Sequence, residues 1–223
     1  MVKIDGKAFS QVILEKIREE HNQLKEKYGK QAGLAVVIVG NNPASQVYVR
    51  NKMKACENVG FYSENIELDE NISEEELLQE IDKLNKNDRI NGILVQLPLP
   101  SHINELKIID SISPEKDVDG FHVANIGKMV IGDETGFLSC TPYGIMQLLE
   151  EYKIEIAGKD AVIIGRSNIV GKPMAQLLLA KNATVTLTHS RTHNLAQVAS
   201  KADILVVAIG RAKFVTADFV KPG

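Results

Sequence analysis

The sequence predicts an α/β protein of two lobes, an N-terminal parallel α/β substrate domain and a C-terminal Rossmann-like domain. Two observations predict this class. Short apolar runs alternate with amphipathic segments in both halves of the chain, and a glycine-rich turn over residues 165–173 opens the second series. A Tyr48-x-x-x-Lys52 pair lies more than a hundred residues before that turn. We therefore expect domains at residues 1–140 and 141–223, with a cleft between them.

The first half of the chain shows both helical and strand periodicity. Apolar residues at helical spacing predict an amphipathic helix over residues 7–28. The wholly apolar run at residues 34–39 predicts a strand covered on both faces, as in a parallel sheet. Ser73 and Glu76 have the spacing of a capping box that begins a helix. The other elements expected here are a helix over 44–58 closed by Gly60, a strand over 61–68 and a strand over 92–96.

The second half begins with a connection and then repeats the alternation. Residues 111–141 are rich in Asp, Gly, Ser and Pro, so we expect an irregular segment carrying loop residues that can face a cleft. A second βαβ series is expected after it. Its elements are a helix over 142–152, a strand over 161–164, a helix over 171–180, a strand over 183–188 and a strand over 204–208.

Composition and charge narrow the function classes. Charged residues make up 25% of the chain and hydrophobic residues 44%, which is ordinary globular usage. The net charge of −3 gives no reason to expect nucleic acid or an anionic membrane as a partner. No apolar run approaches the roughly 20 residues of a membrane span, the N-terminus is not that of a signal peptide, and Cys56 and Cys140 are too few for a disulfide framework. We expect a soluble cytoplasmic protein.

The turn from Gly165 to Pro173 has the features of a phosphate-binding loop. A phosphate needs backbone N–H groups pointing at it and no side chain in the way, which a strand, a tight turn and a helix N-terminus provide. Gly165 ends the expected strand, and Gly171 allows close packing of the helix that follows. Ser167 replaces the middle glycine of the G-x-G-x-x-G pattern, so an ordinary β–α turn remains the alternative.

The residues after the next expected strand indicate which nucleotide is bound. NAD-binding folds place an acidic residue there, about 20 residues beyond the turn, to hold the ribose 2′-hydroxyl. Here the strand leads into His189-Ser190-Arg191, without a carboxylate. Arg166, Ser190 and Arg191 could surround a 2′-phosphate, because arginine offers a fork of charged donors. The pattern predicts NADP rather than NAD, with a solvated cationic loop as the alternative.

Tyr48 and Lys52 supply a phenol and an amine one helical turn apart, so both side chains face the same way. Taken alone, the pair is also compatible with a half-exposed helix face. Short-chain dehydrogenases use a Tyr-x-x-x-Lys pair, but there it follows the nucleotide turn. Here it precedes the turn, and the order excludes that class.

Two further polar side chains are candidates for the site. Gln96 stands at the C-terminal end of an expected strand, where parallel sheets present ligand-binding groups. Asp119, in Asp117-Val118-Asp119-Gly120-Phe121, offers a carboxylate that can take paired N–H donors from a heterocycle. A turn-forming aspartate is the alternative for Asp119.

Together these segments resemble the bifunctional methylenetetrahydrofolate dehydrogenase/methenyltetrahydrofolate cyclohydrolase family. The resemblance implies oxidation of 5,10-methylenetetrahydrofolate with NADP, then hydrolysis of the methenyl product to 10-formyltetrahydrofolate in the same cleft. It further implies a homodimer, a place in one-carbon metabolism and purine biosynthesis, and no metal. The matching stretches fall in order along nearly the whole chain: Val39–Ser45, Tyr48–Cys56, Gln96–Pro100, Asp117–Phe121, Cys140–Gly144, Gly165–Pro173 and His189–Thr192.

The resemblance also implies residue roles. Lys52 would be the catalytic amine, Tyr48 would position and stack on the folate, and Gln96 would hydrogen-bond to Lys52 and tune it. Asp119 would grip the amino edge of the pterin. The residues expected to bind NADP are Gly165, Arg166, Ser167, Gly171, Ser190 and Arg191.

Two features depart from the family pattern. Ser139 stands where the family usually has proline before Cys-Thr-Pro, and we expect little consequence. Lys221-Pro222-Gly223 is a turn expected to lead into another strand, whereas family members continue with more strands, a glycine-rich loop and a final helix. The alternative to an active enzyme is therefore a catalytically weakened protein that still binds folate or NADP, or a partner for a complete subunit.

Overall fold

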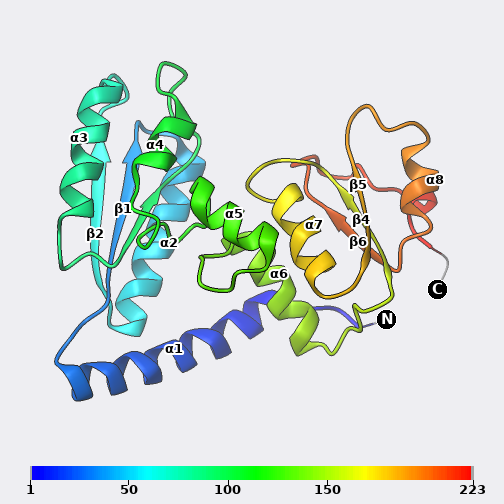
Figure 1. Ribbon diagram of the computed structural model, residues 1–223, viewed down its shortest axis with the longest axis horizontal. Helices are drawn as coiled ribbons and strands as arrows, with labels where there is room; N and C mark the ends of the chain where they lie inside the picture. The colour runs from blue at the N-terminus through cyan, green and yellow to red at the C-terminus, as the bar shows by residue number, and fades with distance from the viewer. Residues whose placement is uncertain (1, 222–223) are drawn as a thin grey trace. The chain divides into compact units, whose positions relative to one another are not determined.

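The computed structural model describes residues 2–221 and has two compact units, Met1–Ala124 and Asn125–Gly223 (Figure 1). Each unit has its own three-stranded parallel sheet, ordered β2-β1-β3 in the first and β5-β4-β6 in the second. The predicted α/β class with parallel sheets is confirmed. The compact units divide after Ala124, and Met129 and Leu138 pack against the core of the second unit.

The first sheet is centred on the wholly apolar run that the sequence marked as a buried strand. Successive residues of a strand point to opposite faces. Accordingly, Val37 packs with Leu77 and Ile81 on one face, and Ile38 packs with Val49 on the other. The strands are β1 (Gly33–Val39), β2 (Tyr62–Leu68) and β3 (Gly92–Val95).

The helices of the first unit begin and end at local sequence signals. The Asn42 side chain accepts hydrogen bonds from the N–H groups of Ala44 and Ser45 at the start of α2, and Gly60, with φ 79°, ends it. Ser73 and Glu76 form the predicted capping box of α3. The helices are α1 (Gly6–Tyr28), α2 (Pro43–Val59), α3 (Glu74–Asn85) and α4 (Glu105–Ser111).

The second sheet is built in the same way around β4, whose last four residues are buried. Figure 1 shows α7 on one side of this sheet and α8 on the other. An apolar cluster joins α7 to the sheet and includes Ile163 of β4 with Met174 and Leu178 of α7. The elements are α6 (Cys140–Glu151), β4 (Asp160–Ile164), α7 (Gly171–Ala180), β5 (Thr184–Thr188), α8 (Leu195–Ala199), β6 (Ile204–Val207) and the short 3-10 helix η1 (Ala217–Phe219).

One expectation about the connection is wrong. Residues 111–141 are not wholly irregular, because they contain the helix α5 (Val123–Ile131). Its Asn125 is buried and accepts a hydrogen bond from the N–H of Phe137, which ties the helix to the loop after it. Val130 and Ile131 are exposed although they are apolar.

None of the helices within residues 2–221 is long and apolar enough to cross a bilayer. Most of the turn expected at Lys221-Pro222-Gly223 lies outside the described residues.

Candidate functional site

The first cluster of candidate residues joins α2 to the end of β3. Gln96 directly follows β3, and its N–H donates to the Val37 carbonyl at 2.8 Å, which continues the ladder with β1. The Lys52 Nζ donates to the Gln96 Oε1 at 3.1 Å. The other end of the same amide, Nε2, donates to the Leu97 carbonyl at 2.9 Å. Two hydrogen bonds thus fix the amide plane, which presents its oxygen to the lysine.

Buried residues of α2 lie beside its candidate residues and anchor the helix to the first unit. Val49 and Cys56 are buried against the first unit, and burial raises the pKa of the Cys56 thiol, which keeps it neutral and structural. Lys52 is half-buried. Tyr48, one turn earlier, is 62% exposed, so its ring offers a flat surface to solvent. The predicted shared face of Tyr48 and Lys52 on a helix is present.

The two aspartates in the loop after α4, Asp117 and Asp119, have different environments. Asp117 is 1% exposed, and its carboxylate accepts the N–H groups of Phe121 at 3.2 Å and His122 at 2.8 Å. The Asp117 carboxylate therefore takes its paired N–H donors from its own loop and not from a heterocyclic ligand. Asp119, two residues on, is half-buried and remains the candidate for a ligand.

The same loop is anchored by a residue that the sequence did not single out. The Lys116 Nζ donates to the carbonyl oxygens of Leu84, Asn85 and Asn87 at 3.2, 2.8 and 3.0 Å, which satisfies the end of α3. The Lys116 carbonyl in turn accepts the Ile93 N–H at 2.7 Å. The loop that carries Asp119 is therefore bonded alongside β3, the strand that leads to Gln96.

The glycine-rich turn of the second unit needs its two glycines for steric reasons. Gly165 has φ 121°, and a Cβ there would lie 2.3 Å from the Ala208 carbonyl oxygen. A Cβ on Gly171 would lie 2.2 Å from the Gly165 carbonyl oxygen, so α7 begins as close to the turn as the sequence predicted. The Ser167 hydroxyl accepts the N–H groups of Val170 at 3.2 Å and Gly171 at 3.3 Å. This serine replaces a glycine and stabilises the turn from within.

The loop after β5 lies at the same edge of the second sheet. The Gly165 N–H donates to the Thr188 carbonyl at 3.0 Å, and the Thr188 hydroxyl donates to the Ile163 carbonyl at 2.8 Å. These bonds bring the segment that begins at Gly165 beside the segment that follows Thr188. The predicted residues on the two segments, Arg166, Ser190 and Arg191, are all exposed.

Ser139 makes a contact that the sequence did not predict. It is 1% exposed, and its hydroxyl donates to the Ile169 carbonyl, inside the glycine-rich turn, at 3.0 Å. No pattern in the sequence pairs these positions, because the contact depends on where α6 begins.

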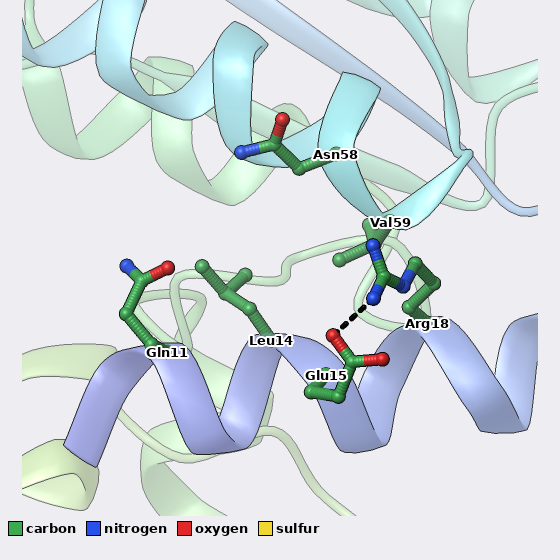
Figure 2. A pocket seen from close by; sticks show the side chains of 6 residues that line it. All are labelled: Gln11, Leu14, Glu15, Arg18, Asn58 and Val59. Carbon is green, nitrogen blue, oxygen red and sulfur yellow. Dashed lines mark hydrogen bonds and ion pairs between the residues drawn. The ribbon is translucent and has the colours of Figure 1, made fainter. Parts of the chain in front are cut away.

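A hollow on the first unit does not contain the predicted site. It lies between α1 and α2, has a volume of about 270 Å³ and is lined mainly by polar side chains, with Leu14 and Val59 (Figure 2). Figure 2 shows Glu15 and Arg18 joined in an ion pair along α1. Its lining residues are Gln11, Leu14, Glu15, Arg18, Asn58 and Val59.

Comparison with known proteins gives one consistent result. Residues 4–119 match the tetrahydrofolate dehydrogenase/cyclohydrolase catalytic domain, and residues 139–223 match the NAD(P)-binding domain of the same family. The bifunctional protein FolD of Streptococcus thermophilus is 60% identical over 220 residues, which are 99% of this chain and 77% of that protein.

Solved structures agree with the sequence matches. The FolD dehydrogenase/cyclohydrolase of Campylobacter jejuni aligns with a TM-score of 0.96 at 51% identity, over 99% of this chain and 78% of its own. The FolD of Trypanosoma brucei, solved with NADP cofactor and an inhibitor, aligns with a TM-score of 0.96 at 38% identity, over 100% of this chain and 76% of its own. This chain belongs to the tetrahydrofolate dehydrogenase/cyclohydrolase family.

Proposed function

We propose that the chain oxidises 5,10-methylenetetrahydrofolate to 5,10-methenyltetrahydrofolate with NADP and hydrolyses that product to 10-formyltetrahydrofolate. Membership of the family supports both activities, and the NADP complex of the Trypanosoma brucei relative supports the cofactor. The observation that carries the catalytic assignment is the hydrogen bond from the Lys52 Nζ to the Gln96 Oε1. It places an amine of fixed direction at the edge of the first sheet where ligand groups are presented.

Lys52 accepts a proton during hydrolysis in this proposal. Water adds to the methenyl carbon, a C–O bond forms, and the bond from that carbon to N5 breaks, leaving the formyl group on N10. In its neutral form the Lys52 amine takes one proton of the attacking water, and N5 takes the other as its bond to the carbon breaks. An amine that donates one N–H to Gln96 keeps its lone pair free for that proton. Gln96 therefore acts by orienting Lys52.

Tyr48 and Asp119 hold the folate in this proposal. The exposed ring of Tyr48 stacks on the flat pterin. The Asp119 carboxylate accepts the paired N–H donors at the amino edge of the pterin, while Asp117 and Lys116 hold the loop in shape. Two contacts of different geometry fix the orientation of the substrate, which a directed hydride transfer requires.

The glycine-rich turn and the loop after β5 bind NADP, which supplies a hydride acceptor when bound. The turn fits a phosphate, because within residues 2–221 the backbone N–H groups of residues 166–169 have no hydrogen-bond acceptor. Exposed Arg166 and Arg191, with Ser190, fit a 2′-phosphate. Gly165 and Gly171 allow the close approach of strand, turn and helix.

We propose further that the protein works in the cytoplasm as a homodimer and that its formyl product serves purine biosynthesis. The scarcity of cysteine supports a reducing compartment. The homodimer and the pathway rest on the family resemblance. Light scattering on the purified chain tests this proposal, because a homodimer has twice the chain mass of 24.5 kDa.

The two activities are tested by following methenyltetrahydrofolate by absorbance. The purified chain is given 5,10-methylenetetrahydrofolate with NADP, and separately with NAD, and hydrolysis is measured from added methenyl substrate without cofactor. We expect turnover in both assays and a preference for NADP. Binding of folate or NADP by a folded chain without turnover would favour the weakened binding protein instead.

A further inference from the structure

The hydroxyl of Ser139 is used in an unusual way for its position. Ser139 is the N-cap of α6, where a serine side chain ordinarily accepts an N–H from the first turn of its own helix. Here the side chain makes no such cap bond. Its hydroxyl instead donates to the Ile169 carbonyl at 3.0 Å, 30 residues away in sequence. At 1% exposure the residue is closed to water, so solvent does not compete for this bond.

The bond completes a clamp on a single peptide group. The peptide between Ile169 and Val170 has its carbonyl oxygen held by the Ser139 hydroxyl. Its N–H donates to the Ser167 hydroxyl at 3.2 Å. Because a peptide group is planar, bonds at both ends determine its orientation. The peptide that leads into Val170, the N-cap of α7, is therefore held by two serines, one within the turn and one outside it.

We propose that Ser139 is a positioning residue for the dinucleotide-binding turn. An anion at a helix N-terminus is favoured by N–H groups and opposed by carbonyl oxygens that point toward it. A reversed 169–170 peptide would point its carbonyl at the Ser167 hydroxyl, remove the hydrogen bond of Val170 to Ser167, and disturb the turn whose N–H groups at residues 166–169 are proposed to receive the phosphate. Ser139 prevents that reversal by holding the carbonyl toward α6. The identity of the ligand, NADP, rests on the proposed function.

Two substitutions at Ser139 distinguish the effect of its hydroxyl from the effect of its backbone conformation. Ser139 has φ −54°, which lies within the range that proline imposes. Among the described residues its N–H donates no hydrogen bond, so Ser139→Pro removes the hydroxyl while it keeps the backbone fixed. Ser139→Ala removes the hydroxyl without fixing the backbone. Ser200→Ala is the matched control, because the Ser200 hydroxyl donates to the Gln197 carbonyl at the end of α8.

The test measures NADP binding to the folate-free protein by titration calorimetry. A neutral hydrogen bond contributes about 0.5–1.5 kcal/mol, so Ser139→Ala and Ser139→Pro should each raise the Kd for NADP roughly 2- to 13-fold. Amide exchange in the peptide covering residues 166–171 should accelerate in both variants without ligand. In the assays the KM for NADP should rise while kcat and the NADP-independent hydrolysis stay at the parent level. Ser200→Ala should match the parent throughout.

The outcomes distinguish this inference from the proposed function. A parent Kd in both folded Ser139 variants would overturn the inference, even if their unfolding temperatures fell, because Ser139 would then be structural only. A parent chain that binds no NADP would overturn it too. If the parent binds NADP but does not oxidise the folate, the proposed activity fails, and the Kd and exchange comparisons still decide the role of Ser139.

Discussion

The Lys52 Nζ and the Gln96 Oε1 lie 3.1 Å apart, although 44 residues separate the two positions in sequence. One side chain comes from α2 and the other from the end of β3. Because the Gln96 amide is also bonded to the Leu97 carbonyl, the strand end and not the helix determines where the amine points. We propose that the two residues act as one catalytic unit.

Gln96→Ala should reduce hydrolysis by about 10²-fold while the protein stays folded. The substitution removes the acceptor that orients the Lys52 amine, and a small misplacement of a catalytic group has an effect of that order. The measurement is kcat and KM for oxidation and hydrolysis. Gln79→Ala, at an exposed position on α3, is the control and should retain parent rates. Parent hydrolysis in Gln96→Ala would contradict the orienting role.

Asp117→Ala and Asp119→Ala should fail in different ways, although the residues are two apart. Loss of Asp117 leaves the N–H groups of Phe121 and His122 without their acceptor, which should lower the free energy of unfolding by roughly 2 kcal/mol or more. Asp119→Ala should raise the KM for the folate, because it removes the proposed contact with the pterin, and should lower stability less than Asp117→Ala, because Asp119 is less buried. Chemical denaturation and steady-state kinetics measure both. Equal loss of stability in the two variants would show that Asp119 also has a structural role.

Gly171→Ala should destabilise the second unit by about 1–3 kcal/mol or more, because the added Cβ meets the Gly165 carbonyl oxygen. Gly144→Ala is the matched control. Gly144 lies inside α6, and a Cβ there meets no atom within 4 Å. Since alanine is the better helix former, this change should stabilise by about 0.5–1 kcal/mol. Thermal unfolding measures both, and an increase in stability for Gly171→Ala would contradict the described turn.

The capping box of α3 should make stability depend on pH. The Ser73 hydroxyl, and then the Ser73 N–H, lower the pKa of the Glu76 carboxyl. A lowered pKa in the folded state contributes stability that is present above the unfolded value of about 4.3 and is lost as pH falls through the folded value. Glu76→Gln keeps the box but cannot titrate. The difference in Tm between parent and Glu76→Gln should therefore shrink below about pH 4. A constant difference between pH 7 and pH 3 would contradict this.

Much of the fold could be predicted because its local signals agree with its packing. Residues 171–180 form a helix as predicted, since Gly171 and Pro173 begin it and its apolar face is buried. The five-residue α8 was not anticipated, because so short a helix shows no period and begins after Asn194 in a left-handed conformation. Sequence patterns predict long elements well and short ones held by neighbouring segments poorly.

The candidate site could be predicted only in part. Spacing and strand ends pointed to Lys52 and Gln96, and the structure joins them by a hydrogen bond. The tasks of Lys116 and Ser139 could not be foreseen, because each bonds backbone carbonyls of segments distant in sequence. Such contacts arise from tertiary packing and have no signature in spacing.

The role of Lys52 as proton acceptor is tested by measuring hydrolysis of 5,10-methenyltetrahydrofolate by Lys52→Met beside the parent and Lys54→Met. Lys54 is on the same helix but exposed, so its substitution controls for loss of a charge and gain of a thioether. We expect that Lys52→Met loses hydrolysis by more than about 10²-fold, while Lys54→Met keeps parent rates and both remain folded. Parent hydrolysis in Lys52→Met would show that another group accepts the proton.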